Sequence, residues 1–186
     1  HGRRAPPGAP APMMKTRGEI EPRTPITNAP YTIAQPGTYY LVSNLTSATD
    51  GVIIRTNGVV LDLMGFALSG DRSSSGDVGV YVEGTNAAPI LDVVVRNGPI
   101  HDFGYGIRMA HSRAGRLEEL NVASNANGGI WLYGRFGKCS GNAIRNCAVH
   151  DNNGEGIFFY GYCGQCAGTV VVRSAIVRNG KDGVTF

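Results

Sequence analysis

One short phrase returns throughout the chain and constrains its fold more than any other feature. A glycine followed by an aliphatic residue opens six segments: Gly51-Val52, Gly79-Val80, Gly106-Ile107, Gly129-Ile130, Gly156-Ile157 and Gly183-Val184. Successive glycines are 28, 27, 23, 27 and 27 residues apart. A β-prone repeat of this length is typical of stacked units, in which each coil packs only against its neighbours.

Alternation within each repeat assigns the side chains to two faces, because successive residues of a strand point to opposite sides. The residue after each glycine is aliphatic, and the residue two positions later is also apolar, so both point inward. Four residues before the glycine lie Asp102, Asn125, Asn152 and Asn179. Stacked at one turn, these four residues are expected to form a ladder of hydrogen-bonded side chains.

Inward aliphatic stacks and a repeated Asn corner predict an all-β fold, a single-stranded right-handed parallel β-helix. This solenoid has about five coils plus the start of a sixth. Residues 51–186 resemble the pectin-lyase-like β-helix superfamily, through phrases such as Val94-Val95-Arg96-Asn97-Gly98-Pro99-Ile100 and Ile144-Arg145-Asn146-Cys147-Ala148-Val149. The whole chain is similar to secreted bacterial β-helix repeat proteins of uncharacterised function. This resemblance implies a fold rather than an activity, because the motif is a packing motif.

Three regions follow along the chain. Residues 1–25 are rich in Pro, Gly and Ala and are expected to form a disordered leader. Residues 26–50 are expected to form a β-hairpin cap, with a type II turn at Pro36-Gly37 between two β-prone runs. Residues 51–186 are the repeats. Because the sequence stops four residues into a coil, further coils are expected beyond Phe186.

Charge and hydropathy exclude some partners. Residues 1–25 hold five Lys/Arg and two Asp/Glu, whereas residues 26–186 hold twelve of each. The basic excess therefore lies in the leader, and no basic face that would bind nucleic acid is predicted. No apolar run approaches the length of a membrane span. The chain starts at His1 without a signal-peptide core, and we expect a secreted or cell-surface protein whose signal has already been removed.

The outward positions of the glycine-led strands are the most suggestive for function. Trp131, Tyr133, Phe158 and Tyr160 are predicted to form a two-by-two aromatic block, with Tyr81 and Arg108 beside it in the same row. Exposed aromatic clusters usually mark a contact surface. A flat platform with rings about 4.8 Å apart would stack sugar rings, so we expect polysaccharide to bind along this face. The alternative is a structural or adhesive repeat protein, and in a purely structural one this face is covered by a long loop, a missing coil or a second subunit.

Catalysis is not evident in the pattern. The resemblance implies that lyases of this fold use an Asp/Glu cluster for calcium and an Arg or Lys base, while the hydrolases use clustered aspartates. Neither set falls on one face here, which leaves only Arg108 and Glu83 as weak catalytic candidates. No metal site or other cofactor is evident, and Ca²⁺ is possible if the protein is a lyase. A polysaccharide lyase or glycoside hydrolase with some catalytic residues missing therefore stays the alternative.

Two His-Asp pairs also attract notice. His101-Asp102 and His150-Asp151 could each be a base with its orienting carboxylate. His101 lies five residues before its glycine and His150 lies six, so the two pairs are not expected to stack. We interpret them as turn residues.

The cysteines complete the list of candidates. Cys139 and Cys166 each lie ten residues after a repeat glycine, which places their Cα atoms about 5 Å apart in adjacent coils. A disulfide between them is predicted, with Cys163 as the alternative partner for one of them. A zinc site at the Cys163-Gly-Gln-Cys166 motif, or free thiols, are the other interpretations. A disulfide is consistent with secretion.

Overall fold

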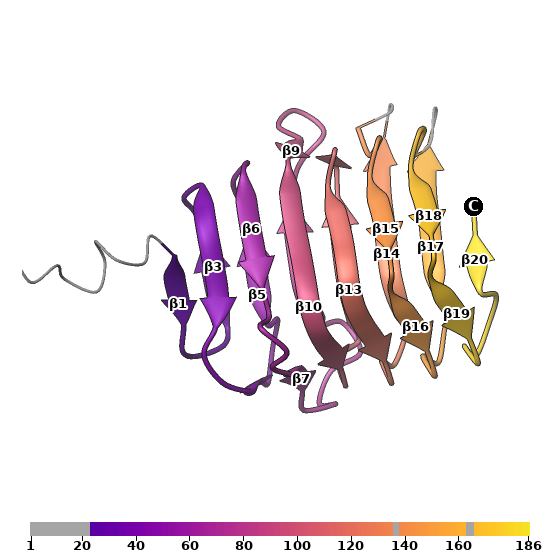
Figure 1. Cartoon of the computed structure of the whole chain (residues 1–186). Helices are drawn as coiled ribbons and strands as arrows, with labels where there is room; N and C mark the ends of the chain where they lie inside the picture. Colours follow the sequence, from indigo (N-terminus) through magenta and orange to yellow (C-terminus); the bar gives the residue numbers. More distant parts are fainter. Residues whose placement is uncertain (1–22, 136–137, 163–165) are drawn as a thin grey trace, which may run out of the picture.

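The structure is a computed structural model that describes residues 23–135, 138–162 and 166–186. An 11-stranded sheet and a 7-stranded sheet form the walls of one solenoid, and a 2-stranded sheet lies between them (Figure 1). Every recorded strand pairing is parallel and joins two coils. The predicted all-β parallel β-helix is therefore confirmed. Within the described residues, no helix is long and apolar enough to cross a membrane.

Each coil contributes one strand to the 7-stranded sheet: β2 (Tyr31–Ile33), β5 (Val52–Ile54), β8 (Val78–Glu83), β11 (Tyr105–Ala110), β14 (Gly128–Arg135), β17 (Ile157–Tyr162) and β20 (Val184–Thr185). The 11-stranded sheet contains β1 (Thr24–Ile26), β3 (Gly37–Leu41), β4 (Leu45–Ser47), β6 (Val59–Asp62), β7 (Leu68–Gly70), β10 (Val93–His101), β13 (Arg116–Ala123), β15 (Ala143–Arg145), β16 (Ala148–His150), β18 (Val170–Val172) and β19 (Ala175–Val177). The small sheet pairs β9 (Ile90–Leu91) with β12 (Ser112–Arg113).

The register of the 7-stranded sheet confirms the predicted inward stacks. Val52 pairs with Val80, and Ile107 pairs with Ile130, which in turn pairs with Ile157. All of these side chains are buried. Each buried apolar residue therefore packs on its counterpart one coil away, and the core is a column that runs the length of the solenoid.

The asparagine ladder is confirmed for Asn125, Asn152 and Asn179. The Oδ1 atom of Asn152 accepts hydrogen bonds from the backbone N of Asn125 at 3.1 Å and from its Nδ2 at 2.8 Å. The Oδ1 atom of Asn179 accepts the same two bonds from Asn152, at 3.2 and 3.0 Å. These bonds satisfy backbone N–H groups that the turn leaves without a strand partner.

The prediction that Asp102 belongs to this ladder is wrong. Ile100 pairs with Val122. Ile100 lies six residues before Gly106, whereas Val122 lies seven residues before Gly129, so the turn before Gly106 is one residue shorter. This shorter turn places Phe103 at the head of the ladder, where its backbone N donates to Asn125 Oδ1 at 3.1 Å. Asp102 has a positive φ of 66° and lies at the outer corner of the coil instead.

The predicted N-terminal hairpin is also wrong. The two runs belong to different sheets: β2 pairs with β5, and β3 pairs with β1 and β6, all in parallel. The chain therefore already follows the solenoid path in residues 26–50 and adds a coil rather than a hairpin cap. Parallel pairing extends the buried stacks through Ile33 and Leu41, whereas a hairpin would have left β5 without its neighbour.

The predicted boundary between the leader and the folded region, at residue 25, is also wrong, because the solenoid begins earlier in the chain. Thr24 and Pro25, expected in the leader, belong to β1 and pair with Tyr39 and Tyr40. Residues 1–22 of the predicted leader lie outside the described residues.

Candidate functional site

The predicted aromatic residues come together on the outer surface of the 7-stranded sheet. Arg108 pairs with Tyr81 on one side and with Trp131 on the other, and Trp131 pairs with Phe158. Tyr133 and Tyr160 form a second row beside them. We call these residues the aromatic face: Tyr81, Arg108, Trp131, Tyr133, Phe158 and Tyr160.

The rings of the aromatic face do not form the expected flat platform. Tyr133 and Tyr160 are parallel within 10° with ring centres 5.5 Å apart, and Trp131 and Phe158 are within 23° at 6.0 Å. Parallel rings this close must overlap with an offset, because rings lying side by side in one plane would clash. Neighbouring rings therefore cover each other's faces, so a ligand would meet ring edges and the recesses beside the rows.

Arg108 extends the first aromatic row. Its guanidinium carbon lies 5.2 Å from the ring centre of Tyr81 and 4.6 Å from that of Trp131, so the cation is held between two ring faces. Glu83 forms an ion pair with Arg55 at 2.5 Å instead. The two weak catalytic candidates thus occupy different rows, and each has its own partner.

An acid that the sequence pattern did not single out lies near Arg108. Asp50 precedes a repeat glycine, and its Oδ1 atom accepts a hydrogen bond from the backbone N of Val78 at 2.8 Å. Burial raises the pKa of Asp50, and the nearby carboxylates of Asp77 and Glu83 raise it further, against the hydrogen bond from Val78 and the charge of Arg108.

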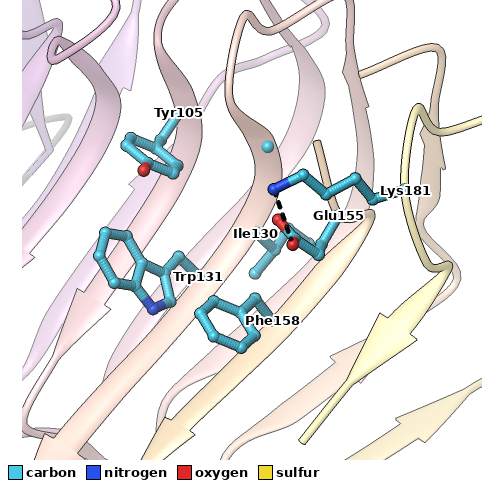
Figure 2. Close-up of a pocket in the computed structure, with 7 residues that line it drawn as sticks. Tyr105, Ile130, Trp131, Glu155, Phe158 and Lys181 are labelled. Atoms are coloured by element: carbon cyan, nitrogen blue, oxygen red, sulfur yellow. Dashed lines mark hydrogen bonds and ion pairs between the residues drawn. The ribbon is translucent and has the colours of Figure 1, made fainter. Parts of the chain in front are cut away.

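A pocket of about 200 Å³ opens beside Trp131. We call it the aromatic pocket, and it is lined by Tyr105, Gly128, Ile130, Trp131, Glu155, Phe158 and Lys181. Figure 2 shows three aromatic rings on one side of it and the ion pair of Glu155 with Lys181 on the other. The two charged atoms of that pair are 3.2 Å apart. Aromatic walls with a few convergent polar groups are typical of small-ligand sites.

The hollow results from a glycine in one column of side chains. Tyr105 pairs with Gly128, and the backbone N of Gly129 bonds to the carbonyl of Glu155, so the three residues line up across adjacent coils. Since Gly128 has no side chain, a gap remains between Tyr105 and Glu155. The ring of Tyr105 turns toward Trp131, with ring centres 5.0 Å apart.

Sequence reasoning missed Tyr105, Glu155 and Lys181. Tyr105 and Glu155 each come directly before a repeat glycine, the same position as Asp50. Extending the register by one residue toward the N-terminus would have found this column. Lys181 lies two residues before its glycine, in a turn, where alternation no longer predicts the direction of a side chain.

A second hollow lies at the outer corner of the coils and has a volume of about 280 Å³. We call it the corner groove, and it is lined by Arg72, Phe103, Ser124, Ala126, Asp151 and Asn153. Asp102, Ser124 and Asp151 occupy equivalent corner positions with φ of 66°, 57° and 55°. The groove exists because the middle coil carries only the small Ser124 and Ala126 between larger neighbours.

The interpretation that the two His-Asp pairs do not stack is wrong. Ala123 pairs with His101 on one side and with His150 on the other, so both histidines occupy the same position two coils apart. Each one contacts its own aspartate through Nδ1, at 2.8 Å for His101 and 2.6 Å for His150. Counting from the glycine failed because the turn before Gly106 is one residue shorter.

Each of these aspartates also pairs with an arginine. Arg178 binds both carboxylate oxygens of Asp151, at 2.8 and 2.9 Å, and Arg72 binds Asp102 through Nε at 2.7 Å. The hydrogen bonds from Arg178 and then His150 hold the pKa of Asp151 far below its usual range. Burial raises the pKa of Asp102, but hydrogen bonds from His101 and Arg72 outweigh it and lower the pKa. Both carboxylates are therefore ionised at neutral pH.

Potential metal ligands are dispersed. Among residues 23–135, 138–162 and 166–186, no three His, Cys, Asp or Glu side chains gather in a way that could hold a metal ion. The calcium cluster implied for a lyase is thus not assembled by the described residues.

Cys139 and Cys166 are buried, and their thiols interact directly. Both are free thiols in the structure, so the predicted disulfide stays a prediction, and Cys163 lies outside the described residues. The hydrogen bond with Cys166, together with burial, raises the pKa of Cys139, while the same bond lowers that of Cys166. Cys166 is therefore the more readily ionised thiol of the two.

We expect the protein prepared under oxidising conditions to contain a Cys139–Cys166 bond. Closing this loop would add roughly 3 kcal/mol to the free energy of unfolding. Peptide mapping by mass spectrometry of the unreduced protein should recover the peptides of Cys139 and Cys166 joined to each other. Four free thiols in that sample would refute the linkage.

His111 makes the stability of the folded protein depend on pH. Its side chain is 8% exposed and meets Tyr133 edge-on at 5.2 Å. Burial lowers the pKa of His111, against a smaller effect of the backbone at Gly84, and the charge of Arg135 lowers it further. The pKa of histidine in the unfolded chain is about 6.5. As pH falls below this pKa, the unfolded chain binds a proton more readily than the folded chain does, so the free energy of unfolding decreases.

We therefore expect His111→Asn to reduce the loss of stability between about pH 7 and pH 5. Asparagine tolerates the positive φ of 49° at this position. Urea unfolding at several pH values measures the effect. Equal pH dependence in the wild type and the variant would show that His111 does not carry it.

A comparison with known families adds the identity of the fold. A family model described as a right-handed β-helix region matches residues 42–186. Neither the curated proteins nor the solved structures include a significant match to the chain. With the parallel register of both large sheets, the family match fixes the hand of the solenoid. The chain belongs to the family of right-handed β-helix proteins.

Proposed function

We propose that this protein is a secreted β-helix protein that recognises a polysaccharide, with the aromatic pocket as the centre of its binding surface. The observation that carries the proposal is the combination of three aromatic rings with one ion pair around a hollow of about 200 Å³. Sugars present apolar C–H surfaces and hydroxyl groups together. The exposed edges of the Tyr105, Trp131 and Phe158 rings give the hollow an apolar wall for the first, and the side chains of Glu155 and Lys181 suit the second.

The exposure of the aromatic face supports recognition over a purely structural role. Tyr160 is 44% exposed, and Trp131, Tyr133 and Phe158 are half-buried. Side chains that served only as packing against another part of this chain would be covered by it. The tyrosine hydroxyls also place hydrogen-bonding groups along the edges of the rings, where a passing glycan would meet them.

Trp131→Ala is expected to weaken polysaccharide binding by tenfold or more, because aromatic side chains at the centre of a binding surface contribute about 2 kcal/mol each. Binding to a panel of polysaccharides by isothermal titration calorimetry measures the effect. Tyr40→Ala is the matched control, since Tyr40 is a half-buried aromatic residue of β3 in the other large sheet. Equal weakening by both variants, or by neither, would argue against the aromatic pocket.

Cleavage of the polysaccharide is the second candidate function, favoured by the carboxyl of Asp50, whose pKa is raised by burial and which feels the charge of Arg108. The same panel should be scored for new chain ends, with and without calcium. New ends would make the protein a lyase or a hydrolase and direct mutagenesis to Arg108, Asp50 and Glu83. Binding without new ends would leave it a recognition module.

A further inference from the structure

The corner groove and the aromatic pocket adjoin each other on the same two turns. Ala126 lines the groove and Gly128 lines the pocket, two residues further along the chain. One coil on, Asn153 lines the groove and Glu155 lines the pocket, again two residues apart. Two residues of extended chain span at most about 7 Å. A chain-like ligand could therefore leave one hollow and enter the next by crossing this turn.

Each charged side chain that lines the two hollows has a partner of opposite charge. In the pocket, Glu155 pairs with Lys181 at 3.2 Å. In the groove, Asp151 pairs with Arg178, and Arg72 pairs with Asp102. An acidic sugar needs an unpaired cation to offset the loss of water around its carboxylate. None of the charged side chains lining the two hollows is left without an opposite charge.

We propose, resting on the function proposed above, that the ligand is a neutral glycan that follows the direction of the coils, around the turn from the aromatic pocket into the corner groove. The pocket supplies aromatic walls for one or more sugar rings. The groove supplies a second subsite, in which Ser124, Asn153, Asp151 and Arg72 offer hydrogen bonds to hydroxyl groups above the apolar floor of Phe103. The ligand thus lies roughly perpendicular to the solenoid axis, whereas the rows of stacked rings run along it.

This arrangement makes affinity depend on the length of the glycan. Short oligosaccharides fill the aromatic pocket alone, whereas longer ones reach the groove and bind more tightly. Ala126→Leu fills the groove with an apolar side chain at an exposed position, so it does not disturb the core. Ala88→Leu is the matched control, because Ala88 is an exposed alanine of a turn that lines neither hollow.

The experiment titrates cello-, xylo- and manno-oligosaccharides, from monosaccharide to hexasaccharide, and oligogalacturonates of the same lengths. We expect a neutral series to gain about tenfold in affinity with length, and Ala126→Leu to remove that gain without weakening the shortest ligand that binds. Trp131→Ala should weaken every length, and Ala88→Leu none.

Other outcomes separate the two proposals. If Ala126→Leu keeps the full gain with length, or if oligogalacturonates bind more tightly than every neutral series, the inference is overturned while the proposed function stands. If no oligosaccharide binds in a way that depends on Trp131, both are overturned.

Discussion

Replacement of Gly129 by alanine is expected to lower the free energy of unfolding by about 3 kcal/mol. A Cβ atom at this position would lie 2.5 Å from Val149 Cγ1 and 2.6 Å from the backbone oxygen of Gly156. That oxygen cannot move away, because it accepts the strand hydrogen bond from Ile130 at 2.9 Å. The backbone oxygen of the next coil approaches similarly closely at Gly51, Gly79, Gly106 and Gly156, so these repeat glycines are required by that approach as well.

Urea unfolding followed by tryptophan fluorescence tests this expectation. Trp131 is the single tryptophan of the chain and lies two residues from the substitution, so it reports on the affected coil. Gly76→Ala is the control, because the nearest atom to its added Cβ is the flexible Ser74 Oγ at 3.6 Å. If both variants unfold at the same urea concentration, the steric explanation of the repeat glycine fails.

Asn152→Ala is expected to cost at least about 3 kcal/mol of unfolding free energy, because several buried polar groups lose their partners together. Its side chain is 1% exposed and bonds to the coils on both sides: to Asn125 and the carbonyl of Val122 on one, and to Asn179 on the other. Each buried group left without a partner contributes about 1–3 kcal/mol to the loss.

Asn121→Ala provides the comparison for Asn152→Ala, since Asn121 is an exposed residue of the same solenoid wall in β13. It removes an identical side chain from the surface and should change stability by less than about 0.5 kcal/mol. Similar losses in the two variants would show that the ladder contributes nothing beyond ordinary packing.

The sequence was sufficient to predict the strands that share a face. The glycine-led phrase fixes one strand in each coil, and alternation then places Trp131 beside Phe158 and Tyr133 beside Tyr160 without knowledge of the turns. The direction of the rings could not be predicted, because alternation gives the side of the sheet and not the side-chain torsion angles. Those angles decide whether ring faces point outward or cover one another.

Errors arose where the number of residues in a turn changed. His101 and Asp102 were placed one position out of register because the turn that leads to Gly106 is shorter than its counterparts. The hairpin error had a different cause. Pro36-Gly37 fits a tight turn between neighbouring strands and equally fits a corner between two sheets, and only the partners of β2 and β3 distinguish the two.

In this solenoid, the number of residues in a coil can change without changing which side chains line up on the outer surface of the 7-stranded sheet. The coil that starts at Gly106 advances by 23 residues where its neighbours need 27 or 28, yet Arg108 remains aligned with Tyr81 and Trp131. The difference is absorbed after β11, where Ala110 is followed almost at once by β12. Loops at this edge can thus lengthen or shorten during evolution, while the spacing of the aromatic rows stays constant.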